Sequence, residues 1–157
     1  MQARINNPVM VIPEAMQALQ ALAAALTKTG VPVSTLDLIN LRASQINGCS
    51  VCVALHVKEM RQRGETDQRM FAVATWRETP YFTEAERAVL ALTEAATRLS
   101  DRSDAVPDAV WDEAARHYNE AQLAAITLGI ANINAWNRVN ATTRQIVGDW
   151  AALDRAA

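Results

Sequence analysis

The chain has 157 residues, of which 50% are hydrophobic and 20% are charged, and its formal net charge is -2. This length predicts one domain over residues 1–157. Nucleic acid is not an expected partner, because acidic and basic residues are interspersed and no basic run occurs. No apolar run reaches the roughly 20 residues that cross a bilayer, and residues 1–16 lack the pattern of a secretory signal. We therefore expect a cytoplasmic protein with no membrane partner.

Apolar residues recur every three or four positions along most of the chain, which predicts an all-α fold of about seven helices. The expected helices span residues 13–28, 34–46, 49–63, 67–75, 83–99, 108–116 and 120–139. Gly30 and Gly64 are placed to end the first and third of these helices. Ser34 is the expected N-cap of the second helix, since its hydroxyl can accept a hydrogen bond from a free backbone N–H.

Two later helices carry start signals. Thr83 and Glu86 have the spacing of a capping box, and Asn119 and Gln122 form a weaker cap of the same kind. The last helix also carries four asparagines in an otherwise apolar stretch, namely Asn132, Asn134, Asn137 and Asn140. Because buried amides need hydrogen-bond partners, we expect these to cap neighbouring helix ends or to cross a subunit interface, with ligand binding as the alternative.

Both cysteines and one of the two histidines lie in the short run NGCSVCVALH, at Cys49, Cys52 and His56. On a helix that turns about 100° per residue, these three positions fall on one stripe about 60° wide, so their side chains can meet in one pocket. Cys49 follows the Asn47-Gly48 turn signal and falls at the helix start, where free backbone amides favour a thiolate. His56 can exchange a proton with a thiol near neutral pH.

Four interpretations compete for this cluster. The two thiols and the histidine can simply pack the interior of the protein. A zinc site is a weaker alternative, because zinc prefers four tetrahedral ligands and the cluster supplies three. Covalent haem attachment needs a histidine directly after the second cysteine, where this chain has Val53. A redox-active dithiol with a histidine base fits the residues and their spacing best, and it needs no bound cofactor.

A carboxylate that orients the histidine would complete such a site. Asp37 is the candidate, because it lies twelve residues before Cys49 on the preceding expected helix. The alternative is a solvated acid in the first turn of that helix, where the helix dipole stabilises negative charge. Spacing alone leaves both interpretations open.

Three runs of this sequence resemble the small AhpD-like alkylhydroperoxidases of the carboxymuconolactone decarboxylase superfamily. These runs are LDLINLRASQINGCSVCVALHVKEMRQRGETDQRM, ATWRETPYFTEAERAVLALTEAAT and INAWNRVN, and the resemblance is strongest over residues 36–97. It implies an all-helical domain with its core at about residues 36–140. Such domains assemble into homotrimers or homohexamers, with the dithiol in a pocket among packed helices. The decarboxylases of the superfamily lack this dithiol, so lactone decarboxylation is not expected.

The resemblance also implies roles for four residues. Cys52 is expected to be the peroxidatic thiol and Cys49 the resolving thiol. His56 is the expected base, and Asp37 is the expected carboxylate of a proton relay. The family usually has Glu at the position of Asp37, and the loss of one methylene shortens the reach by about 1.5 Å, which a bridging water can restore.

The implied activity is that of a thiol-dependent, peroxiredoxin-type antioxidant peroxidase. Its substrates would be organic hydroperoxides or hydrogen peroxide, and an external dithiol or protein reductant would restore the thiols. The alternative is a non-enzymatic or weakly active helical oligomer that responds to redox state. Sequence patterns do not name the physiological hydroperoxide or the reductant.

Overall fold

The computed structural model describes residues 1–100 and 102–148, which form helices joined by turns, without a strand among them. The helices are α1 (Pro8–Val11), α2 (Pro13–Leu26), α3 (Val33–Ile46), α4 (Ser50–Gln62), α5 (Asp67–Ala72), α6 (Glu84–Thr97), α7 (Asp108–His117) and α8 (Glu120–Thr143). Two 3-10 segments, η1 (Thr27–Thr29) and η2 (Val73–Glu78), follow α2 and α5. The prediction of an all-α fold is confirmed. Within the described residues, no helix combines the length and the hydropathy needed to cross a membrane.

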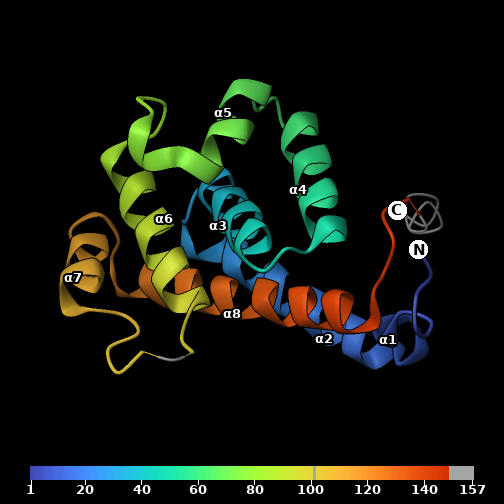
Figure 1. Ribbon diagram of the computed structural model, residues 1–157. Coiled ribbons are helices and arrows are strands. Elements are labelled where there is room, and N and C mark those ends of the chain that lie inside the picture. The colour runs from blue at the N-terminus through green and yellow to red at the C-terminus, as the bar shows by residue number, and fades with distance from the viewer. Residues whose placement is uncertain (101, 149–157) are drawn as a thin grey trace.

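The central helix is α3, and the other helices pack around it. α4 and α6 lie on either side of α3, and the long α8 crosses the ends of all three (Figure 1). Leu38, Ile39 and Leu41 of α3 are completely buried, although they point in different directions from the helix axis. The sequence pattern predicted one buried face for this helix, whereas it is buried on several sides because it has neighbours on several sides.

Most helix boundaries agree with the sequence prediction, and the expected end signals are in place. Gly30 and Gly64 both adopt positive φ, as residues that follow a helix end commonly do. The predicted N-cap at Ser34 is wrong, because α3 begins one residue earlier and Pro32 is its N-cap. The fixed φ of proline already directs the chain into the helix, and the Pro32 carbonyl accepts the first backbone hydrogen bonds without a side-chain cap.

The predicted helix over residues 67–75 ends too late. The α-helical part stops at Ala72, and the chain continues as η2, within which Thr75 has a non-helical φ of -123°. A 3-10 segment is typical of such a short connection, and Pro80 prevents a longer helix because it restricts the residue before it. The short α1 was not predicted, and α8 runs four residues beyond the predicted end at Val139.

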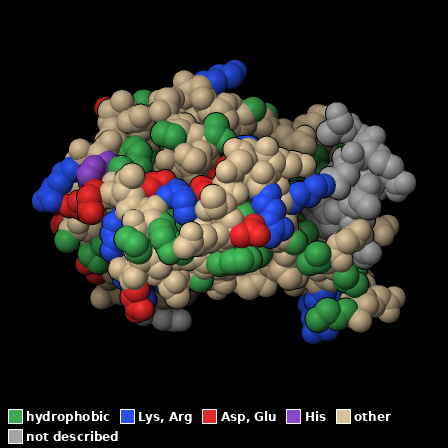
Figure 2. Space-filling view, turned by 90° about the horizontal axis from the view of Figure 1, so that it is seen from above, with side chains coloured by type: hydrophobic (Ala, Val, Ile, Leu, Met, Phe, Trp, Pro, Cys, Tyr) green, Lys and Arg blue, Asp and Glu red, His purple; other side chains and the backbone are tan. Residues whose placement is uncertain are grey.

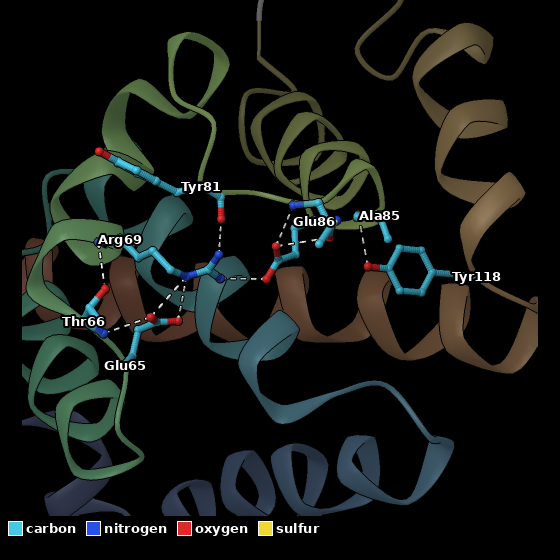
Figure 3. Close-up of polar contacts among 8 residues, drawn as sticks. Glu65, Thr66, Arg69, Tyr81, Ala85, Glu86 and Tyr118 are labelled. Atoms are coloured by element: carbon cyan, nitrogen blue, oxygen red, sulfur yellow. Dashed lines mark hydrogen bonds and ion pairs between the residues drawn. The ribbon is translucent and has the colours of Figure 1, made fainter.

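Both predicted capping boxes are present, at Thr83 with Glu86 and at the start of α8. Glu86 has a second role, because its Oε1 also accepts a hydrogen bond of 2.7 Å from Arg69 of α5 (Figure 3). The same guanidinium donates to Glu65 and to the backbone carbonyl of Tyr81. One arginine therefore holds the start of α6 against α5 and against the loop between them.

Glu94 of α6 is a buried carboxylate that binds three donors. Its oxygens accept hydrogen bonds from Arg42 of α3 at 2.7 Å, from the indole of Trp76 at 3.0 Å and from Arg77 at 2.6 Å. Burial favours the protonated carboxyl, but the hydrogen bonds from Arg77, Trp76 and Arg42 outweigh it and lower the pKa of Glu94. The buried Trp76 thus anchors η2 to α6.

The outer surface carries charges of both signs. Figure 2 shows acidic and basic side chains next to one another on the face seen from above, with hydrophobic side chains scattered between them. Exposed single hydrophobic side chains of this kind are normal for a folded domain.

We expect Glu94→Gln to lower the free energy of unfolding by about 2 kcal/mol at neutral pH, because it leaves the largely buried guanidinium of Arg42 without its charge partner. Since folding lowers the pKa of Glu94, its contribution to stability is complete above the usual pKa of Glu and is lost as the pH falls through the lower folded value. The difference in the free energy of unfolding between the wild type and Glu94→Gln should therefore become smaller as the pH falls. Urea unfolding over a range of pH measures this.

The matched control is Glu113→Gln, whose partner Arg116 is exposed on α7. We expect no measurable change in stability for this variant, because exposed ion pairs contribute little. A stability loss for Glu94→Gln that stayed constant into acid would contradict the role of the ionised carboxylate.

Candidate active site

The two cysteines lie at the turn where α3 ends and α4 begins. Gly48 adopts a φ of +65° in this turn, a conformation that suits glycine because it has no Cβ. Cys49 is the N-cap residue of α4, and its Sγ accepts a hydrogen bond of 3.3 Å from the backbone N–H of Cys52. The predicted position of Cys49 at a helix start is confirmed.

Cys49 and Cys52 are joined by a disulfide, with their Cα atoms 5.3 Å apart. Each cysteine is only 3% exposed, and both lie among the buried apolar residues of the core. Within the described part of the chain, no group of three or more His, Cys, Asp or Glu side chains is placed to hold a metal ion. The pair is therefore positioned to alternate between dithiol and disulfide on one helix end.

His56 lies on α4, four residues after Cys52, and its ring is held by a neighbour on the same helix. The ring Nδ1 is 3.2 Å from Oε2 of Glu59. The hydrogen bond from His56 outweighs burial and lowers the pKa of Glu59. If Nδ1 carries the proton of this hydrogen bond, Nε2 is free to accept or return another proton. Sequence analysis did not select Glu59, although its i, i+3 spacing from a histidine on a helix is a usable signal.

Asp37 lies on α3 and is 6% exposed, so it is not the solvated acid that was the alternative. Its Oδ1 accepts a hydrogen bond of 2.8 Å from Arg63, which follows the end of α4. Burial raises the pKa of Asp37, and the nearby Arg63 guanidinium offsets part of that effect. Sequence analysis did not select Arg63, because nothing in a pattern shows which residue of α4 lies opposite Asp37.

The acidic and basic groups form a chain between α3 and α4. Asp37 binds Arg63, Arg63 lies 4.0 Å from Oε2 of Glu59, and Glu59 binds His56. Across residues 1–100 and 102–148, Asp37 and His56 share no direct hydrogen bond. The structure therefore places the predicted base and the predicted relay carboxylate in one network, with Arg63 and Glu59 between them.

The asparagines of α8 bind the turn that carries the cysteines. Asn47 ends α3, and its side chain donates hydrogen bonds to Asn134 at 3.0 Å and to Asn137 at 2.8 Å. The α8 asparagines thus bind the residue at a neighbouring helix end through its side chain, whereas the prediction was that they cap the backbone groups of that helix. Asn140 differs, because its Nδ2 donates a hydrogen bond of 3.3 Å to Sγ of Cys52. Asn140 was not predicted as a site residue, since 88 positions separate it from Cys52.

Comparison with known proteins agrees with this arrangement. A family model, that of the carboxymuconolactone decarboxylase family, matches residues 13–95. The chain belongs to this family. The AhpD-like resemblance seen in the sequence runs is confirmed. This family includes enzymes, among them the one after which it is named.

Individual relatives and solved structures show how far the similarity extends. The uncharacterized protein YdfG of Bacillus subtilis (strain 168) is 33% identical over 130 residues, which cover 83% of this chain and 87% of that protein. A solved structure from Agrobacterium tumefaciens, of unknown function and proposed to be the antioxidant defence protein AhpD, is 36% identical with a TM-score of 0.85. That match covers 93% of this chain and 98% of the other. The debrominase Bmp8 is 25% identical, with a TM-score of 0.75 over 95% of this chain and 80% of Bmp8.

We expect Arg63→Gln to raise the pKa of Asp37 further, because the substitution removes the cation that stabilises the buried carboxylate. A raised folded pKa means that the protonated carboxyl is the form that folding favours. The variant should therefore be least stable relative to the wild type at neutral pH, and the difference should shrink as the pH falls to the usual pKa of Asp. Titration of the carboxyl carbon by NMR measures the shift directly.

Arg61→Gln is the control for this titration, since Arg61 lies on the same helix and its partner Asp67 is exposed. We expect it to leave the Asp37 titration unchanged. Identical Asp37 titration in Arg63→Gln and the wild type would contradict the role assigned to Arg63.

Proposed function

We propose that this protein is a thiol-dependent peroxidase that reduces organic hydroperoxides or hydrogen peroxide. The observation that carries the proposal is the disulfide between two buried cysteines at the start of α4, with His56 one turn further along the same helix. Membership of a family that includes enzymes supports it, as does similarity to a structure proposed to be an antioxidant defence protein. The proposal places the protein in the cytoplasm as a homotrimer or homohexamer.

In the first step, the Cys52 thiolate attacks the distal oxygen of the hydroperoxide. The S–O bond forms as the O–O bond breaks, and His56 gives its proton to the departing alkoxide, which leaves as an alcohol. Cys52 is then a sulfenic acid. Cys49 attacks the sulfenic sulfur, the disulfide forms and water leaves. An external dithiol or protein reductant then exchanges with the disulfide and returns both thiols.

The charged network gives each acidic group a place in this cycle. Glu59 holds Nδ1 of His56 and so orients the other ring nitrogen for proton transfer. Asp37 is the relay carboxylate of the proposal, because burial raises its pKa toward the range in which it can hold a proton. When Asp37 takes up a proton, it loses its charge and binds Arg63 less strongly, so the guanidinium can move toward Glu59. The nearby positive charge then weakens the hold of the Glu59 carboxylate on the His56 proton. The relay thus works through Arg63 rather than by direct contact.

We expect Cys52→Ser to abolish hydroperoxide consumption with a dithiol reductant, because it removes the attacking thiol and leaves Cys49 without a partner for the disulfide. Cys49→Ser should still react once, and mass spectrometry should find one added oxygen on Cys52. A structure of the debrominase Bmp8 in complex with 2,3,4-tribromopyrrole makes this compound a useful second substrate, because oxidation of a dithiol to a disulfide also balances the replacement of bromine by hydrogen. Undiminished hydroperoxide turnover in Cys52→Ser would exclude the proposal, and bromide release without hydroperoxide turnover would replace it with debromination.

A double-mutant cycle tests the relay. We expect Glu59→Gln to lower turnover by about tenfold or more, because the oriented base is lost. Asp37→Asn should lower turnover less, and adding it to Glu59→Gln should have little further effect, since both act through His56. Asp67→Asn, which removes the exposed partner of Arg61, is the control and should leave turnover unchanged. Additive effects of the two site variants would show that Asp37 acts independently of Glu59.

A further inference from the structure

Three hydrogen bonds in series connect the N-terminal segment to the sulfur of Cys52. The backbone N–H of Val9 donates to Oδ1 of Asn7 at 3.2 Å. Nδ2 of Asn7 donates to Oδ1 of Asn140 at 2.9 Å, and Nδ2 of Asn140 donates to Sγ of Cys52 at 3.3 Å. The series joins α1, α8 and α4, which are far apart in the sequence.

The first bond of the series determines the direction of the other two. The two ends of an Asn amide have nearly the same shape, so shape alone does not decide which end faces which neighbour. A backbone N–H can only donate, so Asn7 must turn its oxygen to Val9 and its NH₂ group to Asn140. Asn140 must then accept with its oxygen, which leaves its NH₂ group facing Cys52. A donor therefore points at this sulfur.

A donor in this position favours the charged form of the thiol. Asn140 is 4% exposed, and Asn7 and Cys52 are also buried, so water competes little for these bonds. In such surroundings a thiolate depends on the few donors that face it, and a hydrogen bond to a charged acceptor is stronger than one to a neutral acceptor. Cys49 has a different donor, the backbone N–H of Cys52. Each sulfur thus has its own hydrogen-bond partner.

The N-terminal segment is fixed against the end of α8 by further bonds. The backbone N–H of Arg4 donates to the carbonyl of Thr143 at 2.9 Å, and its guanidinium donates to the carbonyl of Thr142 at 3.0 Å. Gln145 donates to the carbonyl of Ile5 at 3.1 Å. These bonds hold Asn7 beside Asn140 without touching the cysteines, and Figure 1 shows the N-terminal segment lying beside this end of α8.

We propose that Asn140 is a catalytic residue that stabilises the Cys52 thiolate, and that Asn7 is a positioning residue that keeps the Asn140 NH₂ group facing the sulfur. The inference rests on the proposed function only in taking Cys52 as the attacking thiol. It explains why two asparagines so far apart in the sequence meet beside one cysteine.

The test is a pH titration of the thiolate absorbance in a Cys49→Ser background. Cys52 is then the remaining cysteine, because the chain has two cysteines, and serine keeps an N-cap side chain on α4. In this background we expect Asn140→Ala to move the titration midpoint up by about one pH unit, as expected for loss of a hydrogen bond to a charged group. Asn140→Asp keeps the size of the side chain and should also move the midpoint up, since a carboxylate disfavours a nearby thiolate.

Asn7→Asp tests the positioning role. Aspartate keeps an acceptor for Val9 but cannot donate to Asn140, so Asn140 is free to turn its oxygen toward the sulfur, and the midpoint should rise. Two controls should leave it unchanged. Asn132→Ala removes another buried α8 amide, one that binds the carbonyl of Leu19. Arg4→Ala removes only the guanidinium bond to Thr142, while the backbone bond to Thr143 and the bond from Gln145 to Ile5 still hold Asn7 in place.

The outcomes separate the two proposals. An unchanged midpoint in both Asn140 variants would overturn the inference, even if the wild type consumed hydroperoxide. An equal rise in Arg4→Ala and Asn7→Asp would overturn the positioning role of Asn7. A rise in the Asn140 variants, in a protein that consumed no hydroperoxide, would support thiolate stabilisation and exclude only the peroxidase proposal.

Discussion

The site depends on the hydrogen bonds from Asn47 to the asparagines of α8. These bonds fix the end of α3 against α8, where Asn134 lies 87 residues further along the chain than Asn47. Because α4 begins two residues after this turn, its first residues are placed by the same contact. The start of α4 in turn sets the positions of the groups that the helix carries. These are the two buried sulfurs, the His56 ring and Arg63 at the far end of the helix. The Asn47-Gly48 turn thus positions α4 through hydrogen bonds between Asn47 and distant residues of α8.

Two buried carboxylates on neighbouring helices differ in the number of donors that bind them, and their pKa values shift in opposite directions. Glu94 accepts hydrogen bonds from three side chains, and they lower its pKa, so it stays ionised and holds α3, η2 and α6 together. Asp37 has one arginine partner that is itself half exposed, and burial raises its pKa. A carboxylate with too few donors is less stable as an anion and more useful as a proton carrier.

The fold was largely predictable because its signals are local. Helix periodicity, the glycine ends and the Thr83 capping box depend on residues a few positions apart, and each appears in the structure. The cysteine pair was predictable for the same reason. The partners of Asp37 and Cys52 were not, because they depend on which side chains face each other across packed helices. The error at Ser34 also has a local cause, since Pro32 begins that helix without the cap that a serine would supply.

His56 binds a partner on its own helix, whereas Asp37 binds a partner across the gap between two helices. Glu59 lies three residues after His56 on α4, so their hydrogen bond forms whatever the spacing of α3 and α4. Asp37 lies across that spacing, and its side chain is one methylene shorter than that of Glu. The long side chain of Arg63 covers the distance instead and binds Asp37 at 2.8 Å. A shorter acid on α3 is therefore compatible with a connected network, provided that an arginine on α4 completes it.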